Sequence, residues 1–140
     1  MYLLDTNVVS ELRKPRPHQN VVAWIQTATE ESLYISAVTV GEIQAGIEIT
    51  RQQDMAKAKE IEDWLDSVAQ SFNVLPADAA VFRRWAQLMH PRPNHHLEDA
   101  LIAATALNRG FTVVTRNVRD FESFAVPIVN PFSTTTGSDK

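Results

Sequence analysis

The 140-residue chain contains no cysteine. This absence excludes a disulfide framework, a thiolate zinc site and a cysteine nucleophile, and it fits a reducing compartment. No apolar stretch approaches the roughly 18 residues that a membrane span requires. The N-terminus also lacks the basic segment of a secretory signal, and Asp5 interrupts the first apolar run. We therefore expect a soluble, cytoplasmic protein without a membrane partner.

An excess of basic residues is also missing, since 13 Lys and Arg stand against 17 Asp and Glu. Proteins that coat nucleic acids are usually basic, which counts against that class and against a DNA-binding regulator acting alone. The balance does not exclude a metal-dependent nuclease, because a bound cation reverses the local charge of an acidic site. The sequence has no Walker loop, glycine-rich dinucleotide turn or activated serine that would indicate a different chemistry.

Short apolar segments alternate with amphipathic helical patterns along the chain. We expect strands at about residues 2–4, 33–35, 72–75, 112–115 and 128–129, with helices at about 38–50, 54–70, 78–89 and 97–108. This alternation predicts an α/β fold in which helices cover a parallel sheet of four or five strands. The length fits one domain, residues 1–130, and the small polar residues within 131–140 predict a disordered tail.

Asp5 follows the first apolar segment, Tyr2–Leu4. It therefore stands at the carboxyl end of a predicted strand, where open α/β sheets bind their ligands. A turn or helix-capping aspartate is the competing interpretation, and Thr6 or Asn7 could cap a short helix there. Both interpretations stay open for Asp5 taken alone.

Glu42 stands inside an apolar helical band. The stripe predicted at helical spacing consists of Val38, Glu42, Ala45, Gly46 and Ile49. The spacing from Thr39 to Glu42 also fits a capping box, which is the structural alternative. Because apolar residues extend on both sides of Glu42, we favour a functional carboxylate that needs a cation or a charged partner.

Asp99 likewise begins an apolar face, with Ile102, Ala103 and Ala106 on the same side of the predicted helix. An acid in a first helical turn is favoured by the helix dipole alone, but Glu98 could serve that purpose equally well. Helical geometry points Asp99 inward and Glu98 outward. We therefore choose Asp99 as the site residue.

If Asp5, Glu42 and Asp99 converge, they need a cation. Two carboxylates about 4 Å apart repel by roughly 4 kcal/mol at an effective dielectric constant of 20, a large part of the 5–15 kcal/mol that stabilises a typical domain. Oxygen ligands suit Mg²⁺ or Mn²⁺ better than Zn²⁺, and such a site can activate water against a phosphodiester. A phosphatase-like site would need a second acid at Asn7.

Histidine and arginine side chains complete the set of candidates. Adjacent His95 and His96 point apart in an extended segment, so ligation is less favoured than loop polarity or phosphate contact. Several loop cations could rim one edge of the sheet and hold phosphates, although a scattered solvated surface is the alternative. These residues are Arg13, Lys14, Arg16, Arg92, Arg109, Arg116 and Arg119.

Four blocks of the sequence resemble the PIN domain, and in particular VapC-type toxins of type II toxin–antitoxin modules, nearest to the FitB-like branch. The blocks are Leu3–Asn7, Ser36–Ile43, Glu98–Ala106 and Val114–Phe121. The resemblance implies a three-layer α/β/α PIN fold and a Mg²⁺- or Mn²⁺-dependent endoribonuclease that cuts structured RNA such as tRNA. It also implies a homodimer and a cognate antitoxin that blocks the site, joins a hetero-oligomer and carries the complex to operator DNA.

The same resemblance implies the roles of individual residues. Asp5 and Asp99 match the metal-binding acids, and Glu42 matches the acid that completes the metal site. Either Asn117 supports a three-acid site or Asp120 supplies a fourth acid. Because Asn117 brings no charge, a catalytically weak PIN-like module that acts through protein binding is the alternative function.

Overall fold

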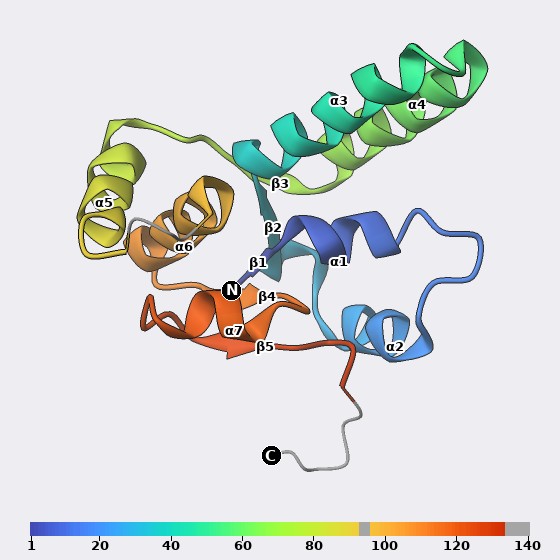
Figure 1. Ribbon diagram of the computed structural model, residues 1–140. Coiled ribbons are helices and arrows are strands. Elements are labelled where there is room, and N and C mark those ends of the chain that lie inside the picture. Colours follow the sequence, from blue (N-terminus) through green and yellow to red (C-terminus); the bar gives the residue numbers. More distant parts are fainter. Residues whose placement is uncertain (93–95, 134–140) are drawn as a thin grey trace.

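A computed structural model describes residues 1–92 and 96–133 of the protein (Figure 1). Within these residues, short parallel strands form one sheet in the order β3-β2-β1-β4-β5. The strands are β1 (Tyr2–Leu4), β2 (Leu33–Ser36), β3 (Asn73–Leu75), β4 (Thr112–Val114) and β5 (Ile128–Val129). The predicted parallel sheet is confirmed, including its short last strand.

Helices cover both faces of this sheet. The helical elements are α1 (Thr6–Glu11), α2 (Gln19–Thr27), the short 3₁₀ helix η1 (Glu30–Ser32), α3 (Ala37–Arg51), α4 (Met55–Ser71), α5 (Ala79–Met89), α6 (Leu97–Arg109) and α7 (Val118–Glu122). Those that follow β1 and β2 pack on one face, and those that follow β3 and β4 pack on the other. The predicted three-layer α/β/α architecture is therefore confirmed.

The alternation of side chains along each strand separates the two cores. Leu3 and Val113 are fully buried in the core with α6 and α7, whereas Leu4 and Val114 are fully buried in the core with α1 and α2. Neighbouring residues of a strand point to opposite faces. Strands buried on both faces therefore need the continuous apolar runs that the sequence shows.

Strand order places a switch point between β1 and β4. From β1 the chain first builds β2 and β3 on one side, and it then returns to add β4 and β5 on the other. The connecting helices change face at this point, and the crevice in which open α/β sheets bind their ligands is expected at such a point, at the carboxyl ends of the two central strands. Asp5 directly follows β1 and Thr115 directly follows β4, so both lie at this crevice.

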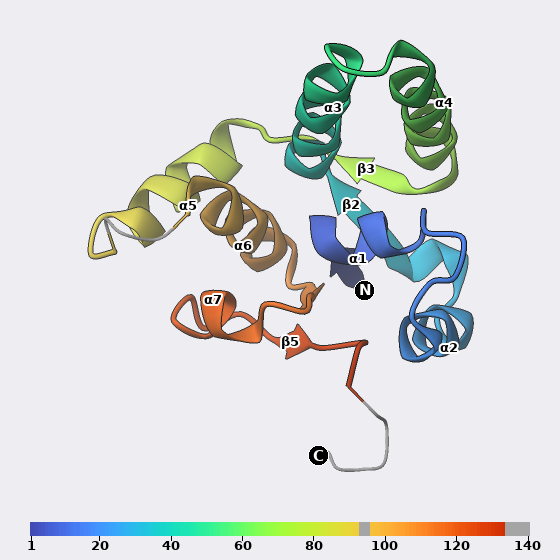
Figure 2. The same cartoon turned by 45° about the vertical axis from the view of Figure 1, so that its right-hand side comes forward.

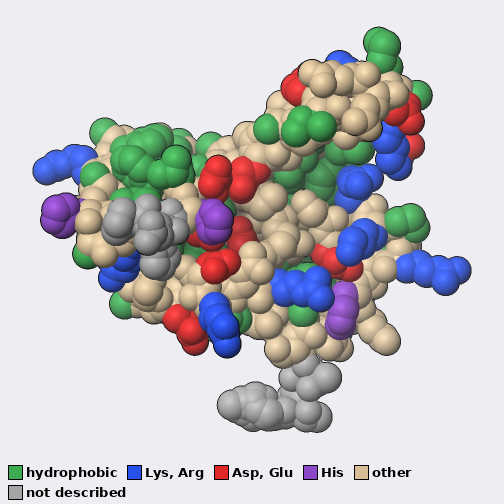
Figure 3. Space-filling model, viewed as in Figure 1, with side chains coloured by type: hydrophobic (Ala, Val, Ile, Leu, Met, Phe, Trp, Pro, Cys, Tyr) green, Lys and Arg blue, Asp and Glu red, His purple; other side chains and the backbone are tan. Residues whose placement is uncertain are grey.

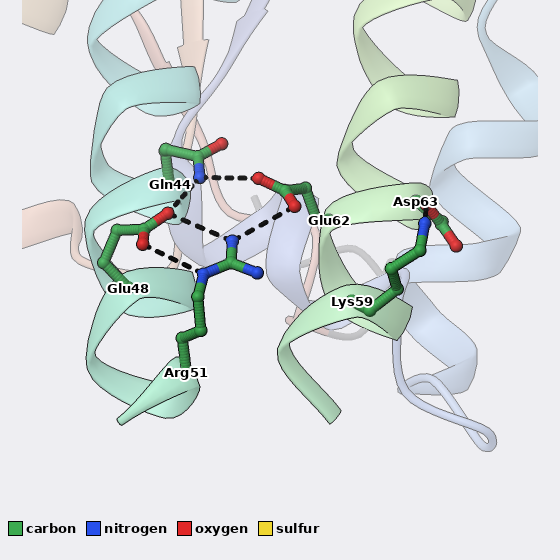
Figure 4. Close-up of polar contacts among 6 residues, drawn as sticks. All are labelled: Gln44, Glu48, Arg51, Lys59, Glu62 and Asp63. Carbon is green, nitrogen blue, oxygen red and sulfur yellow. Dashed lines mark hydrogen bonds and ion pairs between the residues drawn. The ribbon is translucent and has the colours of Figure 1, made fainter. Parts of the chain in front are cut away.

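Helices α3 and α4 form an antiparallel pair that projects from the sheet (Figures 1 and 2). Their contact is apolar through Ile47, Ala58 and Leu65, and a polar network on one side links the two helices (Figure 4). The expected inward stripe of α3 is only partly correct. Ala45 and Gly46 are exposed and Ile49 is 65% exposed, because α3 instead turns Ile47 toward α4.

One other expectation, near the C-terminus, is wrong, and the predicted tail stays a prediction. Residues 118–122, which we expected in a loop, form α7. Most of the predicted tail, residues 134–140, lies outside the described residues, as does His95. In the described ranges, no helix has both the length and the apolar character needed to cross a membrane.

Candidate active site

Asp5 lies at the crevice between β1 and β4 and is only 4% exposed. Its Oδ1 accepts a 2.7 Å hydrogen bond from the Thr6 backbone N–H, so Asp5 itself is the N-cap of α1. Its Oδ2 accepts a 2.8 Å bond from the Thr115 hydroxyl. The expectation that Thr6 or Asn7 caps this helix is wrong, because the carboxylate at the strand end already occupies that position.

Asn7 and Thr115 tie the two central loops together. The Asn7 amide nitrogen lies 3.3 Å from Asp5 Oδ2 and 3.4 Å from Thr115 Oγ1, and its carbonyl oxygen accepts the Arg116 backbone N–H at 3.2 Å. The Thr115 hydroxyl oxygen also accepts the Asn117 backbone N–H at 2.9 Å. These bonds fix the loop after β4 relative to the Asp5 carboxylate.

Glu42 reaches the site from the first half of α3. The Thr6 hydroxyl donates a 2.6 Å hydrogen bond to Glu42 Oε1 and lies 3.0 Å from the hydroxyl oxygen of the buried Thr39. The capping box that was the structural alternative for Glu42 is absent from α3, because Ser36 is the N-cap and accepts the Val38 N–H. Glu42 is therefore directed toward the start of α1, one residue from Asp5, and not back along its own helix.

Asp99 lies in the first turn of α6 and is half-buried, whereas Glu98 is exposed. The apolar stripe below it is confirmed, since Ile102, Ala103 and Ala106 are fully buried. The inward direction expected for Asp99 therefore agrees with its burial. His96, the residue before the helix, makes no capping hydrogen bond through its side chain.

The pKa values show that these carboxylates act on one another. Burial, the charges of Asp5 and Asp120, and a smaller contribution from Glu42 raise the pKa of Asp99 to about 6, against an opposing effect of His96. Burial is also the main cause that raises the pKa of Asp5, with Asp120 adding to it. Figure 3 shows acidic side chains gathered where α1, α3 and α6 meet, with Lys and Arg side chains below and to the right.

Glu42 belongs to the same electrostatic cluster. Burial raises the pKa of Glu42, the Thr6 hydroxyl lowers it, and the charges of Asp5 and Glu98 raise it further. Glu98, which we expected to point away, therefore still contributes its negative charge to the site. We refer to Asp5, Glu42, Asp99 and Asp120 as the carboxylate cluster.

The two candidates for the fourth position differ in the structure. The charge of Asp120, in α7, acts on both Asp5 and Asp99. Asn117 is the N-cap residue of α7 but makes no side-chain capping bond, and its backbone N–H is what contacts Thr115. Asp120 is therefore the residue that brings a fourth negative charge to the cluster.

The donor chemistry of the cluster fits a hard divalent cation. The carboxylates of the cluster, with the Thr6 and Thr115 hydroxyls bonded to them, offer the oxygen ligands that Mg²⁺ and Mn²⁺ prefer. Among residues 1–92 and 96–133, no three His, Asp or Glu side chains are gathered closely enough to hold a metal ion by themselves. Mg²⁺ usually retains several waters and takes only one or two carboxylates directly. Carboxylates that are too far apart to bind one ion together can therefore still hold a hydrated ion through their charges.

Thr6 and Asn7 are the site residues that sequence reasoning missed. Their hydrogen bonds join residues 36 and 109 positions apart, Thr6 with Glu42 and Asn7 with Arg116. The one available signal was their place directly after a strand-end acid.

A cavity of about 300 Å³ opens beside Thr6 toward the α3–α4 pair. It is lined by Thr6, Ser10, Arg13, Glu42, Ile47 and Trp64 among others.

Comparison with known proteins agrees with this geometry. Residues 2–127 match the family model described as the PIN domain. The chain is 36% identical to the toxin FitB of Neisseria gonorrhoeae, covering 94% of this chain and 99% of that protein. It is also 36% identical to the VapC ribonuclease Y4jK of Sinorhizobium fredii, covering 94% and 98% of the two chains.

A solved structure shows the same fold. The structure of FitAB bound to an IR36 DNA fragment superimposes with a TM-score of 0.85 at 32% identity, over 99% of this chain and 100% of that one. The four sequence blocks, the parallel sheet and these near full-length matches all agree. The chain belongs to the PIN domain family, in its branch of VapC and FitB toxins.

Proposed function

We propose that the protein is a Mg²⁺-dependent endoribonuclease and the toxin of a type II toxin–antitoxin module, with Mn²⁺ as a possible substitute metal. The observation that carries this proposal is the convergence of carboxylates beside β1 and β4: Glu42 is hydrogen-bonded to Thr6, next to Asp5, the charge of Asp120 raises the pKa values of Asp5 and Asp99, and the charge of Asp5 also raises that of Asp99. A cluster of this kind gains stability from a divalent cation. The relative named VapC ribonuclease supports RNA as the substrate.

Each residue has a role in this proposal. Asp5, Glu42 and Asp99 would hold a hydrated metal ion, in part through its waters, and Asp120 would orient the attacking water or a second ion, with Asn117 supporting the loop. A bound Mg²⁺ would supply Lewis acidity and lower the pKa of water for hydrolysis of a phosphodiester. Thr6 and Thr115 hold Glu42 and Asp5 in fixed directions through hydrogen bonds of 2.6 and 2.8 Å, which pre-organises the cluster.

The proposed partners follow from the similar proteins and from the surface beside the cluster. We propose structured RNA such as tRNA as the substrate and a cognate antitoxin as the inhibitor. The complex would contact operator DNA through the antitoxin, as supported by the FitAB structure with DNA. The cavity beside Glu42 has an apolar wall and offers an inhibitor a binding place next to the carboxylates. Exposed Phe82 and Leu97 offer apolar surface for a homodimer.

Cleavage of total tRNA in Mg²⁺ tests the proposal. Asp5→Asn keeps the Thr6 N–H and Thr115 hydrogen bonds possible but removes one charge, and we expect it to reduce cleavage by about 100-fold or more, because a metal ligand supplies several kcal/mol of transition-state stabilisation. Glu48→Gln, which removes one exposed acid from α3, is the matched control and should cleave like the parent. Equal cleavage by parent and Asp5→Asn would refute the mechanism.

A further inference from the structure

Two of the loop cations have structural partners away from the carboxylate cluster, and a third lies far from it. The Arg92 guanidinium donates to the Leu88 and Ser123 carbonyls at 2.9 and 2.8 Å, and Lys14 pairs with Glu11 at 2.9 Å. Arg109 lies at the opposite end of α6 from Asp99. Arg116 differs, because it follows Thr115 directly at the active edge of the sheet.

The backbone of Arg116 is fixed at the cluster. Its N–H donates to the Asn7 carbonyl oxygen at 3.2 Å, and the amide nitrogen of the same Asn7 side chain lies 3.3 Å from Asp5 Oδ2. One side chain thus connects the Arg116 backbone to the Asp5 carboxylate. Among the described residues, no ion pair involves Arg116, and its side chain is exposed.

An aromatic ring holds the Arg116 guanidinium in place. Its Cζ lies 4.6 Å from the centroid of the Phe132 ring, and the His18 ring meets the same ring edge-on with centroids 5.4 Å apart. The backbone of Phe132 is anchored as well, because its carbonyl accepts the Asn20 side-chain amide at 2.9 Å and its N–H donates to Asn130 at 3.0 Å. The three groups form a continuous platform, Arg116–Phe132–His18, with the guanidinium over the Phe132 ring and the two rings edge-on.

This platform can offset the repulsion between the carboxylate cluster and RNA. Four carboxylates repel the phosphates of an approaching RNA strand, and the protein has an overall charge of −4. The Arg116 guanidinium, whose backbone is fixed at the cluster, can bind a phosphate by two parallel hydrogen bonds. Unpaired RNA bases stack on aromatic rings and on arginine planes.

We propose that Arg116 binds a phosphate of the RNA strand next to the scissile bond, and that Phe132 and His18 provide the stacking surface for the adjoining unpaired base. The inference rests on the proposed ribonuclease function and adds the way the substrate is held. The opposing view is that Phe132 and Arg116 only fasten the C-terminal segment to the domain. The two views differ in the salt dependence of RNA binding.

The experiment measures binding of a labelled RNA hairpin with a single-stranded loop, across a series of KCl concentrations. Asp5→Asn serves as the parent so that RNA is bound but not cut. Each phosphate contact in a single strand contributes about 0.7 to the slope of log K against log salt. We expect Arg116→Gln to lower the slope by about that amount, Arg116→Lys to keep it, and Phe132→Leu to weaken binding about tenfold at every salt concentration.

Arg83→Gln is the matched control, because it removes an exposed charge from α5 and should leave the slope unchanged. A variant that only unfolds in part changes the apparent affinity but not the slope, so reduced stability does not imitate the expected result. An unchanged slope in Arg116→Gln, with cleavage by the wild type intact, would overturn the platform alone. A lack of RNA binding by the Asp5→Asn parent, together with no cleavage by the wild type, would overturn both proposals.

Discussion

Two acidic regions of this molecule lie in opposite electrostatic settings. On the α3–α4 pair, Arg51 bonds Glu48 at 3.0 Å and Glu62 at 3.1 Å (Figure 4). The Arg51 guanidinium and Gln44 lower the pKa of Glu48, and the same two groups lower the pKa of Glu62. At the crevice, burial and neighbouring carboxylates raise the pKa values instead.

This difference between the two acidic regions shows which of them needs an added cation. Exposed acids on the helix pair already have a guanidinium or an ammonium beside them, as with Lys59 and Asp63 at 3.0 Å, and such surface pairs contribute little to stability. The carboxylate cluster has hydroxyl and amide donors, and among the described residues its electrostatics include His96 as an opposing influence on Asp99 but no ion pair. A metal cation that binds at the carboxylate cluster can supply the positive charge that Arg51 supplies on the α3–α4 pair.

The largest expected effect is stabilisation by metal. Mn²⁺ at about 100 times its dissociation constant should stabilise the native protein by roughly 2.7 kcal/mol, which for a chain of this size raises Tm by about 10 °C. Thermal unfolding followed by circular dichroism measures the shift, and Asp5→Asn should reduce it strongly. Absence of a shift, together with no cleavage of tRNA, would favour a PIN-like binding module without catalytic function.

The next effect compares the two candidates for the fourth position. Asp120→Asn should lower tRNA cleavage by about tenfold, because it removes a charge that acts on Asp5 and Asp99. Asn117→Ala should retain activity within about threefold, since its backbone N–H and not its side chain contacts Thr115. Initial rates at saturating Mg²⁺ measure both variants. An equal loss of cleavage rate in Asn117→Ala would instead assign the fourth site position to the Asn117 side-chain amide.

The smallest effect is a pH-dependent change in stability without metal. The pKa of Asp99 is about 6 in the folded state against an ordinary value of 3.8. The folded protein therefore holds the proton longer than the unfolded chain, and stability falls as the pH rises from about 4 to about 6. At pH 7.5, Asp99→Asn should raise stability by about 1 kcal/mol once the partial exposure of the group is allowed for.

Urea unfolding at pH 4 and 7.5 in EDTA measures this effect, and the gain should largely disappear at the lower pH. Arg51→Gln is the comparison from the helix pair and should act in the opposite direction, because it leaves Glu48 and Glu62 without their cation. If Asp99→Asn destabilised the protein at pH 7.5 as Arg51→Gln does, the two acidic regions would not differ as described.

The strands and the position of Asp5 could be predicted because their causes are local. A continuous apolar run such as Tyr2–Leu4 can be buried on both faces only as an inner strand, and the acid after it must lie at the carboxyl edge. The apolar face of α6 that begins at Asp99 was also predictable, since Ile102 and Ala106 repeat at helical spacing and are fully buried.

The remaining details depend on contacts between distant segments. Glu42 lies near Asp5 as the prediction requires, yet Ala45 and Ile49 of the same stripe were wrongly placed inward, because the direction of α3 is decided by its packing on α4. The hydrogen bond from Thr6 joins residues 36 positions apart, and no local pattern marks it. Helix α7 was missed because Val118–Glu122 is too short for a periodic signal.

The pairing of β1 with β4 also has a consequence for protein synthesis. Leu4 pairs with Val114, and Asp5 accepts its bond from Thr115, 110 residues further along the chain. A nascent chain on the ribosome therefore carries Asp5 but lacks Thr115 until 110 further residues have been added. Since the chain grows at about 5–20 residues per second, the proposed site stays incomplete for several seconds after β1 has been made.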